Sequence, residues 1–167
     1  MDQYPFNKLC VCSLVKPKRC HFGFTLIEIM IAIAIVGTLA AIAIPNYISY
    51  KNRALITEAM EEMRRIETAI TVYMAENVEL PDSLNDVRLG NLKDPWGNPY
   101  EYLRIKGGNK GLGELRKNRS LVPVNSDYDL YSKGKDGKSQ SPFTAKASQD
   151  DIVRANDGSF LGLVSDY

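Results

Sequence analysis

The chain has 167 residues and a formal net charge of +1 at pH 7, and 44% of its residues are hydrophobic. This length allows one globular domain in addition to an apolar segment, and no internal repeat is visible. The near balance of charges argues against a nucleic-acid partner that is attracted by bulk charge.

The three cysteines and the sole histidine all lie within residues 1–23. Cys10, Cys12, Cys20 and His21 could suggest a small metal site, but no second pair of ligands follows along the chain. Without residues 1–23 the chain has no cysteine, and its formal charge is about −2, because four basic residues and one acidic residue are lost. Disulfide bonds therefore cannot stabilise the remainder.

An apolar run extends from Phe24 to Ile44 and contains one charged side chain, that of Glu28. At a helical rise of about 1.5 Å per residue the run spans about 30 Å, the thickness of the hydrocarbon layer of a membrane. The run predicts a single transmembrane helix over residues 24–44. Basic residues before the run favour a cytoplasmic N-terminus, although basic residues beyond it weaken this bias. The former are Lys16, Lys18 and Arg19, and the latter are Lys51 and Arg53.

An ordinary secretory signal has the same order of a basic segment and an apolar segment. The apolar run is long for such a signal. The sequence Pro45-Asn46-Tyr47 at its end also lacks the small residues of a signal cleavage site. A transmembrane helix that is retained in the mature protein is the better interpretation.

Glu28 raises an energetic question, because a carboxylate in hydrocarbon costs about 2.5 kcal/mol or more and acids within membranes are usually functional. One alternative is that Glu28 lies near the interface and reaches the lipid headgroups. The other is that it meets a positive charge inside the membrane.

Residues Lys18-Arg19-Cys20-His21-Phe22-Gly23 and Phe24-Thr25-Leu26-Ile27-Glu28 resemble the class III signal of type IV pilins and type II secretion pseudopilins. The resemblance implies that prepilin peptidase removes a leader, residues 1–23, by cleaving after Gly23, and that Phe24 is then N-methylated. It also implies that Glu28 neutralises the N-terminal amine of a neighbouring subunit during assembly. A paired buried charge costs much less than a lone one. The leader is long for this family, which a translation start closer to Gly23 would explain equally well.

Two residues in the helical segment weaken its backbone. Gly37 is a poor helix former, and Pro45 removes a backbone hydrogen bond. The resemblance implies that the helix unwinds locally between them in assembled filaments. The alternative is that Pro45 marks a kink where the chain leaves the membrane.

Beyond Pro45, apolar residues recur at spacings of three, four or seven, which predicts that one helix continues from about Phe24 to Ala75. Its second half would lie across a small domain, with a charged face toward solvent or toward neighbouring subunits. The apolar positions are Ile48, Leu55, Ala59, Met63, Ile66, Ile70 and Tyr73, and the charged ones are Lys51, Arg53, Glu58, Glu61, Glu62, Arg64 and Glu67.

The sequence Leu80-Pro81-Asp82-Ser83 is expected to end this helical region, because proline disfavours its continuation. Farther along, Asp94-Pro95-Trp96-Gly97-Asn98-Pro99-Tyr100 contains two prolines and one glycine, which predict a fixed loop anchored by the burial of Trp96. This loop closely resembles the DPWG-x-P-Y loop of the major pseudopilin of type II secretion. The matching residues are Asp94, Pro95, Trp96, Gly97, Pro99 and Tyr100.

The rest of the chain predicts a small antiparallel sheet. Strands are expected over residues 100–106, 127–132 and 160–164, with an additional edge strand over residues 121–124 and a flexible turn over residues 107–111. The expected fold is α+β, with one long N-terminal helix packed on the sheet.

Aspartates cluster near glycines in the last third of the chain, and carboxylates on such loops are suitable ligands for Ca²⁺. The alternative is that they form ordinary solvated turns. Major pseudopilins hold calcium in this region, and the resemblance implies ligands at Asp136, Asp150 and Asp151, with the backbone carbonyl of Lys133 as a further candidate. The segment 139–149 is longer than the corresponding family loop.

Beyond residue 23 there is no histidine or cysteine, and nothing around Asp150-Asp151 indicates a pocket for acid–base catalysis. We therefore expect a structural subunit and not an enzyme. The resemblance implies a pseudopilus that drives protein secretion, with the chain anchored in the bacterial inner membrane and residues 45–167 in the periplasm. The implied partners are further copies of the chain, other pseudopilins, prepilin peptidase and the inner-membrane assembly platform.

Two alternatives stay open. The chain could be a type IV pilus subunit, which assembles into a filament in the same way but serves adhesion, motility or DNA uptake. It could also be a membrane-anchored binding module that never polymerises.

Overall fold

The computed structural model describes residues 23–108, 111 and 113–167. The expected leader, apart from Gly23, and the cysteines within it lie outside these residues. The contacts divide the chain into two units, residues 1–43 and residues 44–167, which we describe separately.

Helix α1 covers Leu26–Asn77, which confirms the single long helix expected from the apolar periodicity. It begins two residues later than expected and also ends two residues later. The helix ends where Val78 adopts a positive φ of 62° and donates its N–H to the carbonyl of Met74 at 2.8 Å. A left-handed residue of this kind is a common way to end a helix.

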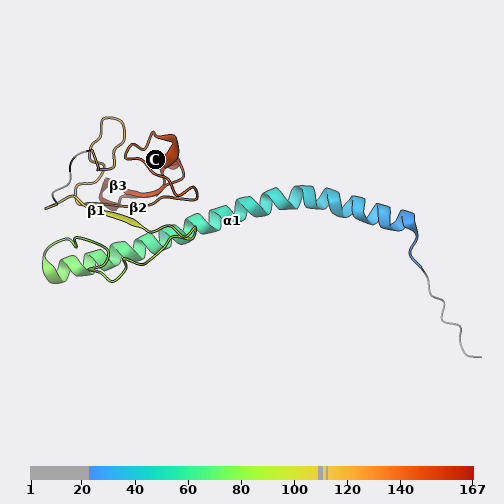
Figure 1. Ribbon diagram of the computed structural model, residues 1–167, viewed down its shortest axis with the longest axis horizontal. Helices are drawn as coiled ribbons and strands as arrows, with labels where there is room; N and C mark the ends of the chain where they lie inside the picture. Colours follow the sequence, from blue (N-terminus) through green and yellow to red (C-terminus); the bar gives the residue numbers. More distant parts are fainter. Residues whose placement is uncertain (1–22, 109–110, 112) are drawn as a thin grey trace, which may run out of the picture. The chain divides into compact units, whose positions relative to one another are not determined.

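The sheet lies in the second unit and contains four antiparallel strands in the order β1-β2-β3-β4. The strands are β1 (Glu101–Arg104), β2 (Tyr128–Ser132), β3 (Ile152–Ala155) and β4 (Phe160–Leu163), and three 3-10 turns accompany them: η1 (Lys146–Ser148), η2 (Asn156–Gly158) and η3 (Val164–Asp166). Figure 1 shows β1, β2 and β3 beside the second half of α1. The α+β fold is therefore confirmed.

Three of the expected strands are present, although each is shorter than expected. The edge strand expected over residues 121–124 is wrong, because Leu121 exchanges backbone hydrogen bonds with Asn118 in a tight turn and Val124 donates to the carbonyl of Arg116. Pro123 also has no N–H to offer to a ladder. The sequence analysis missed β3, whose four residues are all buried and show no polar alternation.

Both faces of the sheet are covered. On the helix side, Ala59, Met63, Ile66 and Ile70 of α1 are 0% exposed and pack with side chains of the sheet, including Leu130. Each isoleucine buried in this way contributes about 1.5–3 kcal/mol. On the other side a smaller cluster gathers Val124, Phe143, Val153, Ala155 and Val164. The segment between β2 and β3 is thus an integral part of the fold.

Candidate functional site

The expected cleavage site lies just before α1. Gly23 and Phe24 precede the helix in a segment without regular structure, and Phe24 is 79% exposed. Thr25 caps the helix, because its Oγ1 accepts a hydrogen bond from the N–H of Glu28 at 3.2 Å. Glu28 therefore lies in the first helical turn. A negative charge there interacts favourably with the helix dipole and stabilises the helix. Cleavage after Gly23 would leave this cap intact.

The apolar run of α1 has no partner within the described part of the chain. Its large apolar side chains, from Phe24 to Ile44, have exposed fractions between 48% and 79%. Among the described residues, α1 is the one helix that is long and apolar enough to cross a membrane. A surface of this size and apolarity requires lipid or other helices around it.

Gly37 and Pro45 lie within α1 and do not interrupt it. A Cβ at Gly37 would meet no atom within 4 Å, so this glycine is not required by close packing within the chain. Unwinding of the helix between these two residues in a filament stays a prediction.

The loop from Asp94 to Asn98 is fixed by its own hydrogen bonds. The carbonyl of Asp94 accepts the N–H of Gly97 at 2.8 Å, which forms a β-turn with Pro95 in its second position. The carboxylate Oδ1 of Asp94 accepts the N–H groups of Trp96 at 3.1 Å and Asn98 at 2.8 Å. Gly97 has a φ of +94°, a conformation that favours glycine. The expected fixed loop is present.

The same loop joins the helix to the segment after β2. Ser132 donates its hydroxyl to Oδ2 of Asp94 at 2.6 Å, and Asn98 donates its amide to the carbonyl of Gly134 at 2.9 Å. At the other end of the loop, the hydroxyl of Tyr100 donates to Glu62 of α1 at 2.6 Å. Burial and this carboxylate raise the pKa of Tyr100. Trp96 packs against the helix-side core as expected.

Asp94→Ala should lower the free energy of unfolding by about 2–3 kcal/mol, because Asp94 is 4% exposed and three donors would lose their acceptor. Asp86→Ala is a matched control, since Asp86 also accepts three hydrogen bonds but lies on the surface. This control should cost about 1 kcal/mol. Urea unfolding of the full chain in detergent measures both, and equal losses would contradict the structural role of the loop.

The acidic residues of the last third lie close together but differ in their partners. Asp136 donates its backbone N–H to Oδ2 of Asp150 at 3.0 Å. The two loops touch at Gly134, where a Cβ would lie 2.1 Å from the carbonyl oxygen of Asp150. Lys133 forms an ion pair with Glu101 through its side chain. The expected residues are thus neighbours in the fold.

Asp151 is 0% exposed and has a partner that the sequence analysis did not foresee. Its Oδ2 accepts hydrogen bonds from Arg116 at 2.7 Å and from the hydroxyl of Ser139. Burial raises the pKa of Asp151, and these two bonds oppose that rise. In the described residues no three acidic, histidine or cysteine side chains gather as a metal site. Calcium binding stays a prediction.

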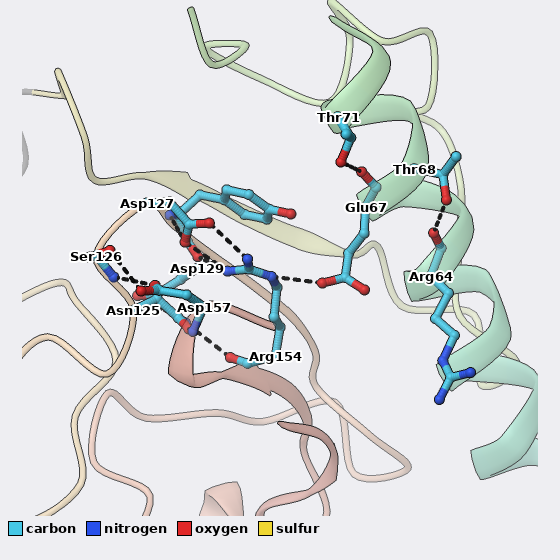
Figure 2. Close-up of polar contacts among 11 residues, drawn as sticks. Arg64, Glu67, Thr68, Thr71, Asn125, Ser126, Asp127, Asp129, Arg154 and Asp157 are labelled. Atoms are coloured by element: carbon cyan, nitrogen blue, oxygen red, sulfur yellow. Dashed lines mark hydrogen bonds and ion pairs between the residues drawn. The ribbon is translucent and has the colours of Figure 1, made fainter. Parts of the chain in front are cut away.

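A second polar cluster joins α1 to the sheet (Figure 2). Arg154 of β3 is 6% exposed and donates to Glu67 of α1 at 2.7 Å and to both carboxylate oxygens of Asp127 at 2.7 Å. Its guanidinium also lies 4.0 Å from the ring centroid of Tyr128. Burial disfavours the charge, but the bonds to the carboxylates prevail and raise the pKa of Arg154.

The turn beside Arg154 is fixed by Asp157. Its carboxylate accepts the backbone N–H of Ser126 at 2.6 Å and the hydroxyl of the same residue at 2.8 Å, which lowers the pKa of Asp157. An open groove of about 780 Å³ lies along this cluster, between α1 and β3–β4. Sequence reasoning missed the cluster. The one signal was a single arginine inside the otherwise apolar stretch Ile152-Val153-Arg154-Ala155.

Comparison with known proteins gives one match to a short N-terminal motif and several matches to most of the chain. The family model described as the prokaryotic N-terminal methylation motif matches residues 18–44. The type II secretion system core protein G of Pseudomonas aeruginosa is 33% identical over 142 positions, which cover 72% of this chain and 88% of that protein. A protein of the same name from Escherichia coli K12 is 31% identical over 137 positions, covering 70% and 83%.

A second group of relatives carries another name. A fimbrial protein of Neisseria meningitidis serogroup A is 30% identical over 135 positions, which cover 81% of this chain and 79% of that protein. No solved structure matches the chain.

The matched motif contains Gly23, Phe24 and Glu28, and the longer matches extend over most of the second unit. A long N-terminal helix, whose second half packs on a small antiparallel sheet, is the fold expected from the resemblance. The chain belongs to the pilin and pseudopilin family, whose members are structural proteins and not enzymes.

Proposed function

We propose that the chain is a structural subunit of a periplasmic pseudopilus that drives protein secretion. Its leader is cleaved after Gly23, Phe24 is N-methylated, and the subunits assemble through their N-terminal helices. The observation that carries the proposal is the bare apolar surface of residues 24–44. Lipid covers this surface before assembly, and neighbouring helices cover it afterwards.

The proposal fixes the orientation of the chain. The N-terminus lies in the cytoplasm, the helix is anchored in the inner membrane, and residues 45–167 lie in the periplasm. The partners are other copies of the chain, other pseudopilins, prepilin peptidase and the inner-membrane assembly platform. The basic residues before Phe24 support this orientation.

Two observations favour secretion over surface pili. The core protein G of Pseudomonas aeruginosa is 33% identical and aligns over 88% of its own length, whereas the fimbrial protein of Neisseria meningitidis serogroup A is 30% identical and aligns over 79%. The sequence of the Asp94 loop also resembles that of the type II secretion major pseudopilin, and the loop has the fixed geometry expected from its prolines and glycine. The fimbrial relative of similar identity supports a second candidate, a type IV pilus subunit.

Intact mass and the N-terminal peptide of the chain test the processing step. In cells with an active prepilin peptidase, the protein recovered from membranes should begin at N-methylated Phe24. A matched sample from cells without the peptidase should retain residues 1–23. A chain that is uncut in both samples, or that is cut after Ile44, would remove the basis for filament assembly.

A deletion strain separates the two candidates. Loss of a set of folded proteins from the culture medium, with surface pili intact, is the result expected for a pseudopilus subunit. Loss of surface pili with unchanged export would favour the type IV pilus subunit. Proteomics of the medium and electron microscopy of the same cells give both readouts.

A further inference from the structure

Arg116 is a buried cation in the segment between β1 and β2. Its side chain is 4% exposed. Nη2 donates to Oδ2 of Asp151 at 2.7 Å, and Nη1 donates to the hydroxyl of Ser139 at 2.6 Å and to the carbonyl of Gln140 at 2.7 Å. One guanidinium thus binds both ends of the segment 139–151.

Aromatic rings and the backbone hold Arg116 in place. The guanidinium carbon lies 4.4 Å from the ring centroid of Tyr131 and 5.1 Å from that of Phe143. The backbone N–H of Arg116 donates to the buried carboxylate of Asp129 at 2.8 Å, and its carbonyl accepts the N–H of Val124 at 3.0 Å. Cation–π contacts of desolvated arginine are favourable. The position of the guanidinium is therefore fixed by contacts on several sides.

The unsatisfied atoms of the site are complementary. Among the described residues, Nε of Arg116 and Oδ1 of Asp151 are buried without a hydrogen-bond partner. One is a donor and the other an acceptor, and both belong to the same ion pair. A divalent cation at Oδ1 would lie beside a fixed guanidinium, and like charges at such short range in a buried site repel strongly. The donor set around Asp151 therefore suits an arginine and not a calcium ion.

The segment 139–151 also contains hydrogen bonds of its own. Inside it, Ser148 donates its hydroxyl to the carbonyl of Gln140 at 2.8 Å, and Gln149 donates to the carbonyl of Phe143 at 2.6 Å. These local bonds order the segment, whereas Arg116 connects it to the rest of the domain. Bringing the two ends of a loop together costs conformational entropy, and the bonds of Arg116 to both ends of this segment offset part of that cost.

We propose that the guanidinium of Arg116 replaces a metal ion as the cation that holds residues 139–151 in the fold. The segment then stays folded without calcium. Asp136 and Asp150 lie outside the contacts of Arg116 and act as turn residues, as their hydrogen bonds to backbone N–H groups indicate.

Thermal unfolding of the full chain in detergent tests this proposal, with the fluorescence of Trp96 as a local probe. Trp96 is the sole tryptophan and lines a small cavity together with Gln149 and Asp150. The wild-type midpoint should be the same in EGTA and in about 10 mM calcium, a concentration above the dissociation constants of weak extracellular sites. Arg116→Leu should lower the midpoint by roughly 10 °C or more in both conditions. Lys138→Leu, at an exposed position beside the same segment, should leave it unchanged.

A calcium-dependent rise of the wild-type midpoint would overturn the proposal, as would an Arg116→Leu chain as stable as the wild type. If Arg116→Leu does not fold, the proposal is tested by thermal unfolding of the wild type in calcium and in EGTA, together with the variant Arg116→Lys. That variant keeps the charge but loses the forked geometry, so its midpoint should fall and should still not respond to calcium. Stabilisation of Arg116→Lys by calcium would count against the proposal.

Discussion

Replacing Glu28 by leucine is expected to abolish filament assembly while the chain is still cleaved and inserted in the membrane. Cleavage after Gly23 would create an ammonium group at Phe24, four residues before Glu28. Either charge alone costs several kcal/mol in hydrocarbon, whereas a pair formed between neighbouring subunits costs much less. The pair therefore favours correct stacking, and its loss should leave free subunits. Filament yield from cells that overproduce the assembly machinery is the measurement.

Two control variants separate charge from other effects of the substitution. Glu28→Gln keeps a hydrogen-bonding side chain in the first turn of α1 but removes the charge, and it should also fail to assemble. Glu61→Leu removes a carboxylate from an exposed position farther along the same helix and should assemble. Intact mass of each variant verifies cleavage. Normal filaments with Glu28→Leu would favour a membrane-anchored binding module that does not polymerise.

The long helix could be predicted from the sequence because the helical spacing of apolar residues is repeated many times along it. Apolar side chains at helical spacing continue from the membrane segment to Ile70, and the innermost positions of the second half, Ala59, Met63, Ile66 and Ile70, are fully buried as expected. The Asp94 loop was also predictable, since Pro95 and Gly97 restrict the backbone locally. Local restraints of this kind depend little on the rest of the fold.

The C-terminal third was harder to predict because its structure depends on distant contacts. Strand β3 is covered on both faces, so it lacks the alternation that marks a half-exposed strand. The residues of 121–124 have strand-like composition, but they turn back toward Asn118. No spacing rule joins Arg116 to Asp151 or Arg154 to Glu67, since these pairs are far apart in sequence. Their roles follow from the topology alone.

Replacing Arg154 by leucine should lower the free energy of unfolding by about 3 kcal/mol. This value lies near the lower end of the range of about 3–5 kcal/mol for removing one partner of a buried ion pair. Arg154 is almost fully buried, and its partners Asp127 and Glu67 are 28% and 24% exposed, so they keep part of their hydration. The substitution also removes a hydrogen bond to the carbonyl of Tyr128 and the contact with its ring. Urea unfolding of the full chain in detergent measures the loss.

Arg64→Leu is the matched control, because Arg64 lies on α1 beside the same groove and forms no ion pair with any described residue. In Figure 2 its side chain extends away from the Arg154 cluster. This variant should change the free energy of unfolding by less than about 0.5 kcal/mol. A double variant, Arg154→Leu with Glu67→Leu, should be more stable than the sum of the two single losses predicts, because the bond between Arg154 and Glu67 is lost in each single variant but counts only once in the double variant. Strict additivity would mean that Arg154 and Glu67 do not couple, and that their bond does not help to hold α1 against the sheet.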